Sequence, residues 1–138
     1  MKLLLIFLLT ISLIFESSIT TIPLTIAVLV VASVVLRDYV VFVLAFIFGI
    51  LLDILTFKTV GLSSLFFTFL VFLILIYERK FEIYTPYFIA FASFLSSLIF
   101  LILFQRGNVI IQSLVCLAVA LFLFEMFKKL NYKIKVND

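Results

Sequence analysis

Residues 39–57, YVVFVLAFIFGILLDILTF, decide the fold class, because this long apolar run contains a single charged side chain, Asp53. A helix that crosses the roughly 30 Å hydrocarbon core of a bilayer needs about 20 apolar residues. Similar runs fill the rest of the 138-residue chain, which is 67% apolar and 12% charged. Soluble domains are about 45–50% apolar and about 25% charged. The composition excludes a soluble enzyme or DNA-binding domain and predicts an all-α integral membrane bundle.

Charged and turn-forming residues divide the chain into six apolar segments of one transmembrane domain, residues 1–138. We predict spans at 3–19, 21–36, 39–57, 60–77, 85–104 and 109–127, followed by a basic tail at 128–138. The runs are long and lack in/out alternation, which favours helices over the strands of a barrel. Pro23 is expected in the first turn of its helix, where proline is tolerated. No internal repeat is apparent.

The positive charges predict the orientation of these spans. Cytoplasmic loops carry an excess of Lys and Arg. Six spans place eight basic residues on the side of the two termini and two, Lys58 and Arg106, on the other side. Both termini are therefore expected on the cytoplasmic side of the membrane. In an alternative interpretation, residues 2–18 are a signal peptide, which would leave five spans in the same orientation.

The residues available for chemistry are few. The chain has no His, one cysteine (Cys116) and three glycines. Imidazole bases, disulfides within the chain and glycine-rich phosphate loops are therefore excluded. We expect no catalytic residue, no cofactor, no metal and no nucleic-acid partner.

Two carboxylates interrupt the apolar runs, and a charge in the membrane is costly enough to suggest a function. Glu16 lies about 21 Å along the first span, and Asp53 lies about 7 Å before Lys58. Both positions belong to the outer half of the membrane. For Glu16 we favour a carboxylate at the interface, either hydrated or paired with Lys58 or Arg106. For Asp53 the same interpretation competes with burial against another helix.

The segment from Phe48 to Leu65, FGILLDILTFKTVGLSSL, contains the clearest motif. Gly49 and Asp53 are four residues apart and share a helix face, where the glycine permits close approach of another backbone. Gly61 suits a tight turn into the next helix because glycine adopts positive φ readily. Ser63 and Ser64 could bond to backbone groups near the start of that helix. These residues predict a tightly packed hairpin with a buried acid.

This pattern resembles the signature of the MreD family of bacterial rod-shape-determining membrane proteins. The resemblance covers about residues 5–80 and rests on Gly49, Asp53 and the Gly61-Leu62-Ser63-x-Leu65 stretch. It extends to the proline that opens the second span, although Leu24 follows Pro23 directly where we would expect Pro-Asp-Leu. Candidate interface residues are Gly49, Asp53, Gly61, Leu62 and Leu65, with Glu16, Pro23 and Lys58 as secondary candidates.

The resemblance implies a non-enzymatic scaffold of cell-wall elongation that spans the bacterial inner (plasma) membrane several times and binds MreC. It also implies indirect association with an MreB filament, RodA and a penicillin-binding transpeptidase. Whether the chain also forms a homo-oligomer is left open. Basic residues in the tail could hold anionic membrane lipids. The alternative is the substrate-binding subunit of an energy-coupling-factor vitamin importer. That family docks through small residues of its first helix, whereas the first span here has neither Ala nor Gly.

Overall fold

The computed structural model describes residues 2–18, 22–56, 59–82, 84–104 and 107–137, with side chains described up to residue 133. Every regular element in these ranges is a helix, as the sequence predicted. The helices are α1 (Lys2–Ser18), α2 (Leu24–Leu36), α3 (Tyr39–Leu55), α4 (Leu62–Glu78), α5 (Pro86–Phe104) and α6 (Val109–Asn137).

Several helix boundaries differ from the predicted ones, and local backbone chemistry explains the differences. Pro23 was expected inside the first turn of α2, but it precedes the helix at the N-cap position with ψ 68°. Gly61 precedes α4 with φ +107°, a conformation that favours glycine. At the other end of the chain, α6 continues to Asn137 through the residues predicted as a separate tail.

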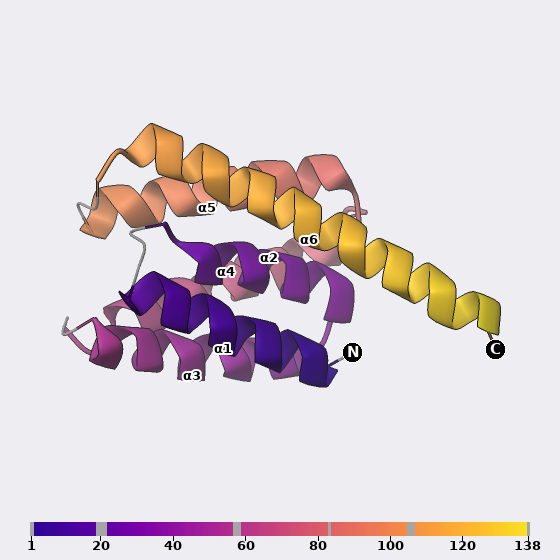
Figure 1. Cartoon of the computed structure of the whole chain (residues 1–138), viewed down its shortest axis with the longest axis horizontal. Coiled ribbons are helices and arrows are strands. Elements are labelled where there is room, and N and C mark those ends of the chain that lie inside the picture. The colour runs from indigo at the N-terminus through magenta and orange to yellow at the C-terminus, as the bar shows by residue number, and fades with distance from the viewer. Residues whose placement is uncertain (1, 19–21, 57–58, 83, 105–106, 138) are drawn as a thin grey trace.

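The six helices form three antiparallel hairpins, α1–α2, α3–α4 and α5–α6, which pack around α2 (Figure 1). Helix α2 is the shortest, yet it contacts all five other helices. Ten consecutive residues of α2, 25–34, are each no more than 2% exposed. A helix that is apolar on every side is found in a protein core or in a membrane, and α2 is covered by other helices on every side. This segment therefore forms the axis of the bundle.

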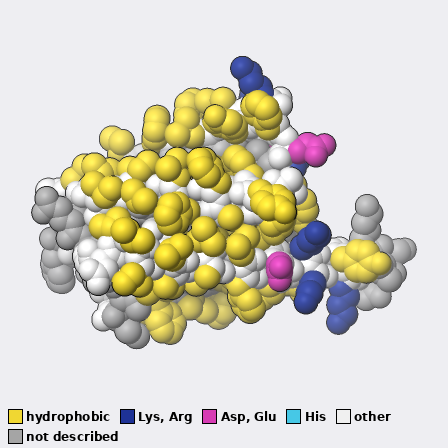
Figure 2. All heavy atoms as spheres, turned by 90° about the horizontal axis from the view of Figure 1, so that it is seen from above, with side chains coloured by type: hydrophobic (Ala, Val, Ile, Leu, Met, Phe, Trp, Pro, Cys, Tyr) yellow, Lys and Arg dark blue, Asp and Glu magenta, His cyan; other side chains and the backbone are white. Residues whose placement is uncertain are grey.

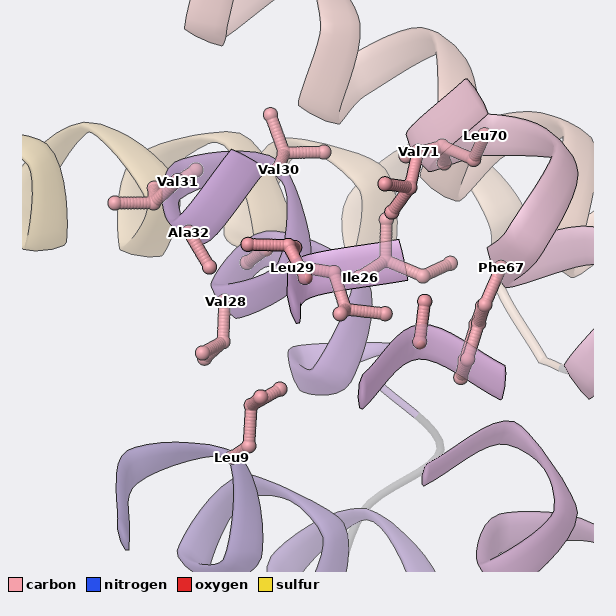
Figure 3. Packing of buried hydrophobic residues seen from close by; sticks show 14 of the residues in the cluster. Leu9, Ile26, Val28, Leu29, Val30, Val31, Ala32, Phe67, Leu70 and Val71 are labelled. Carbon is pink, nitrogen blue, oxygen red and sulfur yellow. The ribbon is translucent and has the colours of Figure 1, made fainter. Parts of the chain in front are cut away.

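Side chains from several helices pack on α2 (Figure 3). Leu9 of α1 points towards Val28 and Leu29, whereas Phe67 and Val71 of α4 approach the opposite side of the helix. These side chains are buried and belong to one continuous apolar core. Helix α2 thereby joins α1 on one side to the α3–α4 hairpin on the other.

Ion pairs gather at the end of the bundle where both chain termini lie, which we call the charged end (Figures 1 and 2). The Lys2 Nζ atom lies 2.7 Å from Asp38 Oδ2, and Arg37 Nε lies 3.3 Å from Glu78 Oε1. These contacts bring together the start of α1, the α2–α3 turn and the end of α4. The opposite end, where the second helix of each hairpin begins, is called the cap end.

The outer surface of the bundle is strongly apolar. Large apolar side chains are exposed on every helix except α2, and Figure 2 shows them over one broad face. Soluble monomers rarely expose a contiguous apolar patch larger than a few hundred Å². Two helical segments of the described chain, Pro86–Phe104 and Val109–Lys133, are long and apolar enough to cross a membrane. The structure is therefore compatible with a membrane protein, and the six-span arrangement stays a prediction.

Candidate functional site

The carboxylate of Glu16 caps the start of the central helix. Its Oε2 atom accepts the backbone N–H of Thr25 at 3.0 Å, and the Glu16 residue is only 2% exposed. The first N–H groups of a helix have no partner within the helix and attract negative charge. The start of α2 lies beside Glu16 and buries it, so its carboxylate is not hydrated; the expected alternative, pairing with Lys58 or Arg106, lies outside the described residues. We call this contact the first carboxylate cap.

The carboxylate of Asp53 caps the start of α4 in the same way. Its Oδ2 atom accepts the backbone N–H groups of Gly61 at 2.8 Å and of Ser63 at 3.1 Å. Asp53 is fully buried, as one of the two sequence interpretations required. Both donors belong to the main chain. We call this contact the second carboxylate cap.

Gly49 allows α3 and α4 to approach closely one turn away from the second cap. A Cβ atom built on Gly49 would lie 2.3 Å from the Cα atom and 2.7 Å from the backbone nitrogen of Ser64. The Ser64 hydroxyl donates to the carbonyl oxygen of Phe46 at 3.2 Å. The sequence had suggested a bond to backbone near the start of α4, whereas the Ser64 hydroxyl bonds to the backbone of α3. The close backbone approach predicted for Gly49 is present within the chain itself.

The two caps share one plan. In the α1–α2 and α3–α4 hairpins, an acid near the end of the first helix accepts the N–H of the second residue of the next helix, Thr25 in α2 and Ser63 in α4. Each of these residues follows a leucine, in Pro23-Leu24-Thr25 and in Gly61-Leu62-Ser63. This short repeat escaped the sequence analysis because its members are separated by unequal connections. In the third hairpin, apolar Phe100 and Leu101 stand at the equivalent distance before the second residue of α6.

The remaining predicted residues lie apart from the buried acids. Leu62 and Leu65 point outward and are 54% and 70% exposed. Pro23 is buried beside the first cap, where its carbonyl oxygen lies 3.5 Å from the Cys116 sulfur atom. Lys58, a secondary candidate, lies outside the described residues. The structure therefore unites Gly49, Asp53 and Gly61 and places the two leucines on the surface.

A groove runs along the outer face of the α3–α4 hairpin. It has a volume of about 510 Å³. Phe42, Phe46 and Phe69 are among the aromatic residues of its lining, and Gly61, Ser64 and Thr68 contribute small or hydroxyl side chains. The Thr68 hydroxyl donates to the Ser64 carbonyl oxygen, so both hydroxyls of the groove have backbone partners. The groove consequently offers an apolar surface rather than a polar binding site.

Chemically, these sites can hold helices together and present an apolar surface. Among the described residues, no three Asp, Glu or Cys side chains are grouped as a metal site. No known protein family, curated protein or solved structure matches this chain. The likeness to MreD therefore rests on the motif residues alone and stays a prediction.

Proposed function

We propose that the chain is a non-enzymatic membrane subunit of the bacterial cell-wall elongation machinery, similar to MreD. In this proposal all six helices cross the inner membrane and both termini lie in the cytoplasm. The observation that carries the proposal is the α3–α4 hairpin. Gly49, Asp53 and Gly61, the residues that resemble the MreD signature, act there as one structural unit.

Each of these three residues has a separate physical task in that unit. Gly49 removes the side chain that would keep the helices apart, and Asp53 ties the end of α3 to the start of α4. Gly61 supplies the positive φ of the connection. A hairpin held at its turn and along its length has a rigid outer face, and rigidity lowers the entropic cost of binding. This supports a role in presenting a surface to a partner.

We assign that partner surface to the outer groove of the hairpin and its occupant to the single membrane helix of an MreC-like protein. The part of the lining on α4, from Ser64 to Phe72, extends about 12 Å along the helix, which is slightly more than two helical turns. Small residues at a helix interface permit close backbone approach in a membrane. Leu65 stands at the rim of this groove and also lines a second one, of about 430 Å³, between α4 and α5.

The charged end would face the cytoplasm in this arrangement. Lys128, Lys129 and Lys133 are exposed on the C-terminal part of α6, which extends beyond the charged end (Figure 1). Each could gain about 1 kcal/mol near an anionic membrane surface. Contacts with an MreB filament, RodA and the transpeptidase would be indirect, through the MreC-like partner.

Capture of the partner tests the proposal. Leu65→Trp places a bulky ring at the groove, and Ile110→Trp is the matched control on α6, because the two native residues are 70% and 68% exposed. We expect Leu65→Trp to reduce co-purification of the MreC-like protein at least tenfold, while Ile110→Trp leaves it unchanged. Equal capture by both variants would refute the groove assignment. A vitamin retained through purification would favour the importer alternative instead.

A further inference from the structure

All five tyrosines of the chain lie at the charged end of the bundle. Tyr39 is the first residue of α3, and Tyr77 lies in the last turn of α4. Tyr84 precedes α5 and Tyr87 is its second residue, whereas Tyr132 lies in the C-terminal part of α6. The connections at the cap end contain no tyrosine. We call these five residues, which come from different helices, the tyrosine collar.

The collar combines exposed aromatic rings with free hydroxyl groups. Four of its five members are more than half exposed, and none of the five hydroxyls bonds to another group of the described chain. Purely apolar aromatic residues are distributed differently, because Phe15 and Phe104 lie near the cap end. Tyrosine is enriched where a membrane meets water, since its ring is apolar and its hydroxyl is polar. The collar therefore marks the charged end as an interfacial surface.

The same end carries positive charge that the described part of the protein does not neutralise. Five exposed basic side chains there have no carboxylate within salt-bridge distance among the described residues: Arg79, Lys80, Lys128, Lys129 and Lys133. Two exposed carboxylates, Glu82 and Glu125, also stand outside the two ion pairs. Five cations against two carboxylates leave an excess of three positive charges. This excess favours a partner that carries negative charge.

The length of α6 places its lysines at a defined depth. The helix begins at Val109 at the cap end, so Lys128 and Lys133 lie about 29 and 36 Å along it. A bilayer is about 30 Å thick across its hydrocarbon core and about 40–45 Å thick with both headgroup layers. If Val109 lies at one edge of the hydrocarbon core, these lysines extend from the inner to the outer edge of the opposite headgroup layer. Phosphate groups lie at that depth.

We propose that the charged end binds the headgroups of anionic phospholipids, with the five unpaired cations against phosphate groups and the tyrosine collar between the headgroups and the acyl chains. Ammonium, guanidinium and hydroxyl groups all donate to phosphate oxygens. An acidic protein segment would match the charge, but it would not account for tyrosines on several helices at the same end. The inference rests on the part of the proposed function that places the bundle in a membrane.

Quenching of tyrosine fluorescence tests the inference on the full chain. The chain has no tryptophan, so its intrinsic emission comes from the collar alone. The protein is placed in phosphatidylcholine vesicles that contain an equal minor fraction of either brominated phosphatidylglycerol or brominated phosphatidylcholine. Attraction to an anionic surface amounts to about fivefold for each basic residue. We therefore expect contact with phosphatidylglycerol to be preferred at least fivefold, and bromine near the carbonyl to quench more than bromine at the chain end.

Charge variants separate the lysines from the rest of the surface. The triple variant Lys128→Gln, Lys129→Gln and Lys133→Gln leaves as many unpaired cations as carboxylates, so the lipid preference should disappear. The matched control replaces the same three lysines with arginine, which keeps the charge and should keep the preference. Both variants alter exposed side chains and leave the core unchanged.

Three results would overturn the inference: equal quenching by the two lipids, a preference that survives the glutamine variant, or stronger quenching by bromine at the chain end. Equal quenching would leave an acidic protein segment as the partner of the charged end. Extraction with alkaline carbonate keeps the proposed function separate. Release of the chain from the vesicles would refute its place in a membrane, whereas a chain that stays without lipid preference refutes this inference alone.

Discussion

Replacement of Gly49 by alanine should loosen the α3–α4 hairpin. The added Cβ atom would lie 2.3 Å from Ser64 Cα, whereas ordinary contacts begin at 3.4 Å. The helices must therefore separate by about 1 Å at this crossing. Overpacking of this kind costs about 1–3 kcal/mol. Helix propensity acts in the opposite direction, because alanine is favoured over glycine by about 0.5–1 kcal/mol within a helix.

The two atoms nearest to a side chain added at Gly49 are backbone atoms of Ser64, which cannot move away as a flexible side chain could. We expect Gly49→Ala to lower the free energy of unfolding by about 1.3 kcal/mol, which is a mid-range overpacking cost of about 2 kcal/mol less a propensity gain of about 0.75 kcal/mol. Adding Ser64→Gly should not restore stability, because the Ser64 Cα and nitrogen atoms remain in place. Leu51→Ala is the control on the exposed side of α3.

Reversible unfolding in bicelles, measured by steric trapping or denaturant titration, gives the required free energies. A Gly49→Ala variant as stable as the native chain would show that the two backbones are not in contact. Full recovery by Ser64→Gly would show that the side chain, and not the backbone, was the obstacle. Either result would refute the reasoning about the hairpin.

Three further outcomes are expected. Asp53→Asn keeps an oxygen that can accept the cap N–H groups, so it should fold better than Asp53→Leu, which leaves them unpaired at about 1–3 kcal/mol; equal stability of the two variants would deny the cap. The pKa of Asp38 lies below its ordinary 3.8 because the Lys2 ammonium group donates to it and lies close by. The ion pair of Asp38 should contribute fully to stability above pH 3.8, and this contribution should fall as the pH drops through the lowered pKa. Unfolding curves measured over a series of pH values should lose this acid dependence in Asp38→Asn. In intact cells, a cysteine at Arg106 should react with an impermeant thiol reagent and one at Arg79 should not; the reverse labelling would invert the proposed orientation.

The helix count could be predicted because charged and turn-forming residues punctuate the apolar runs. The two carboxylate caps could not be predicted, because every residue except proline has a main-chain N–H group and the sequence does not show which of these groups an acid will bind. Glu16 was assessed from its depth along one helix, whereas its burial depends on where α2 begins. A usable signal for Asp53 was present in Gly49 and Gly61, since both are needed for the close, sharply turned hairpin.

The central position of α2 was also not predicted, because all six segments are similarly apolar. One signal was available in its composition. The chain contains 19 phenylalanines, yet none lies within LTIAVLVVASVVL, residues 24–36. A helix surrounded by five others has room mainly for small and β-branched side chains, which pack densely at close helix–helix distances. The outer helices carry the aromatic residues.

The enclosure of α2 divides the chain into parts that should diverge at different rates. An outward-facing Leu, Ile or Phe can be exchanged for another apolar residue at little cost, whereas a core residue of α2 tolerates mainly volume-conserving changes. Descendants of one ancestor could thus lose overall similarity while they retain this small-residue axis and its flanking acids. Distant relatives should be recognisable by an aromatic-free second helix preceded by a buried Glu or Asp, long after their outer helices have ceased to align.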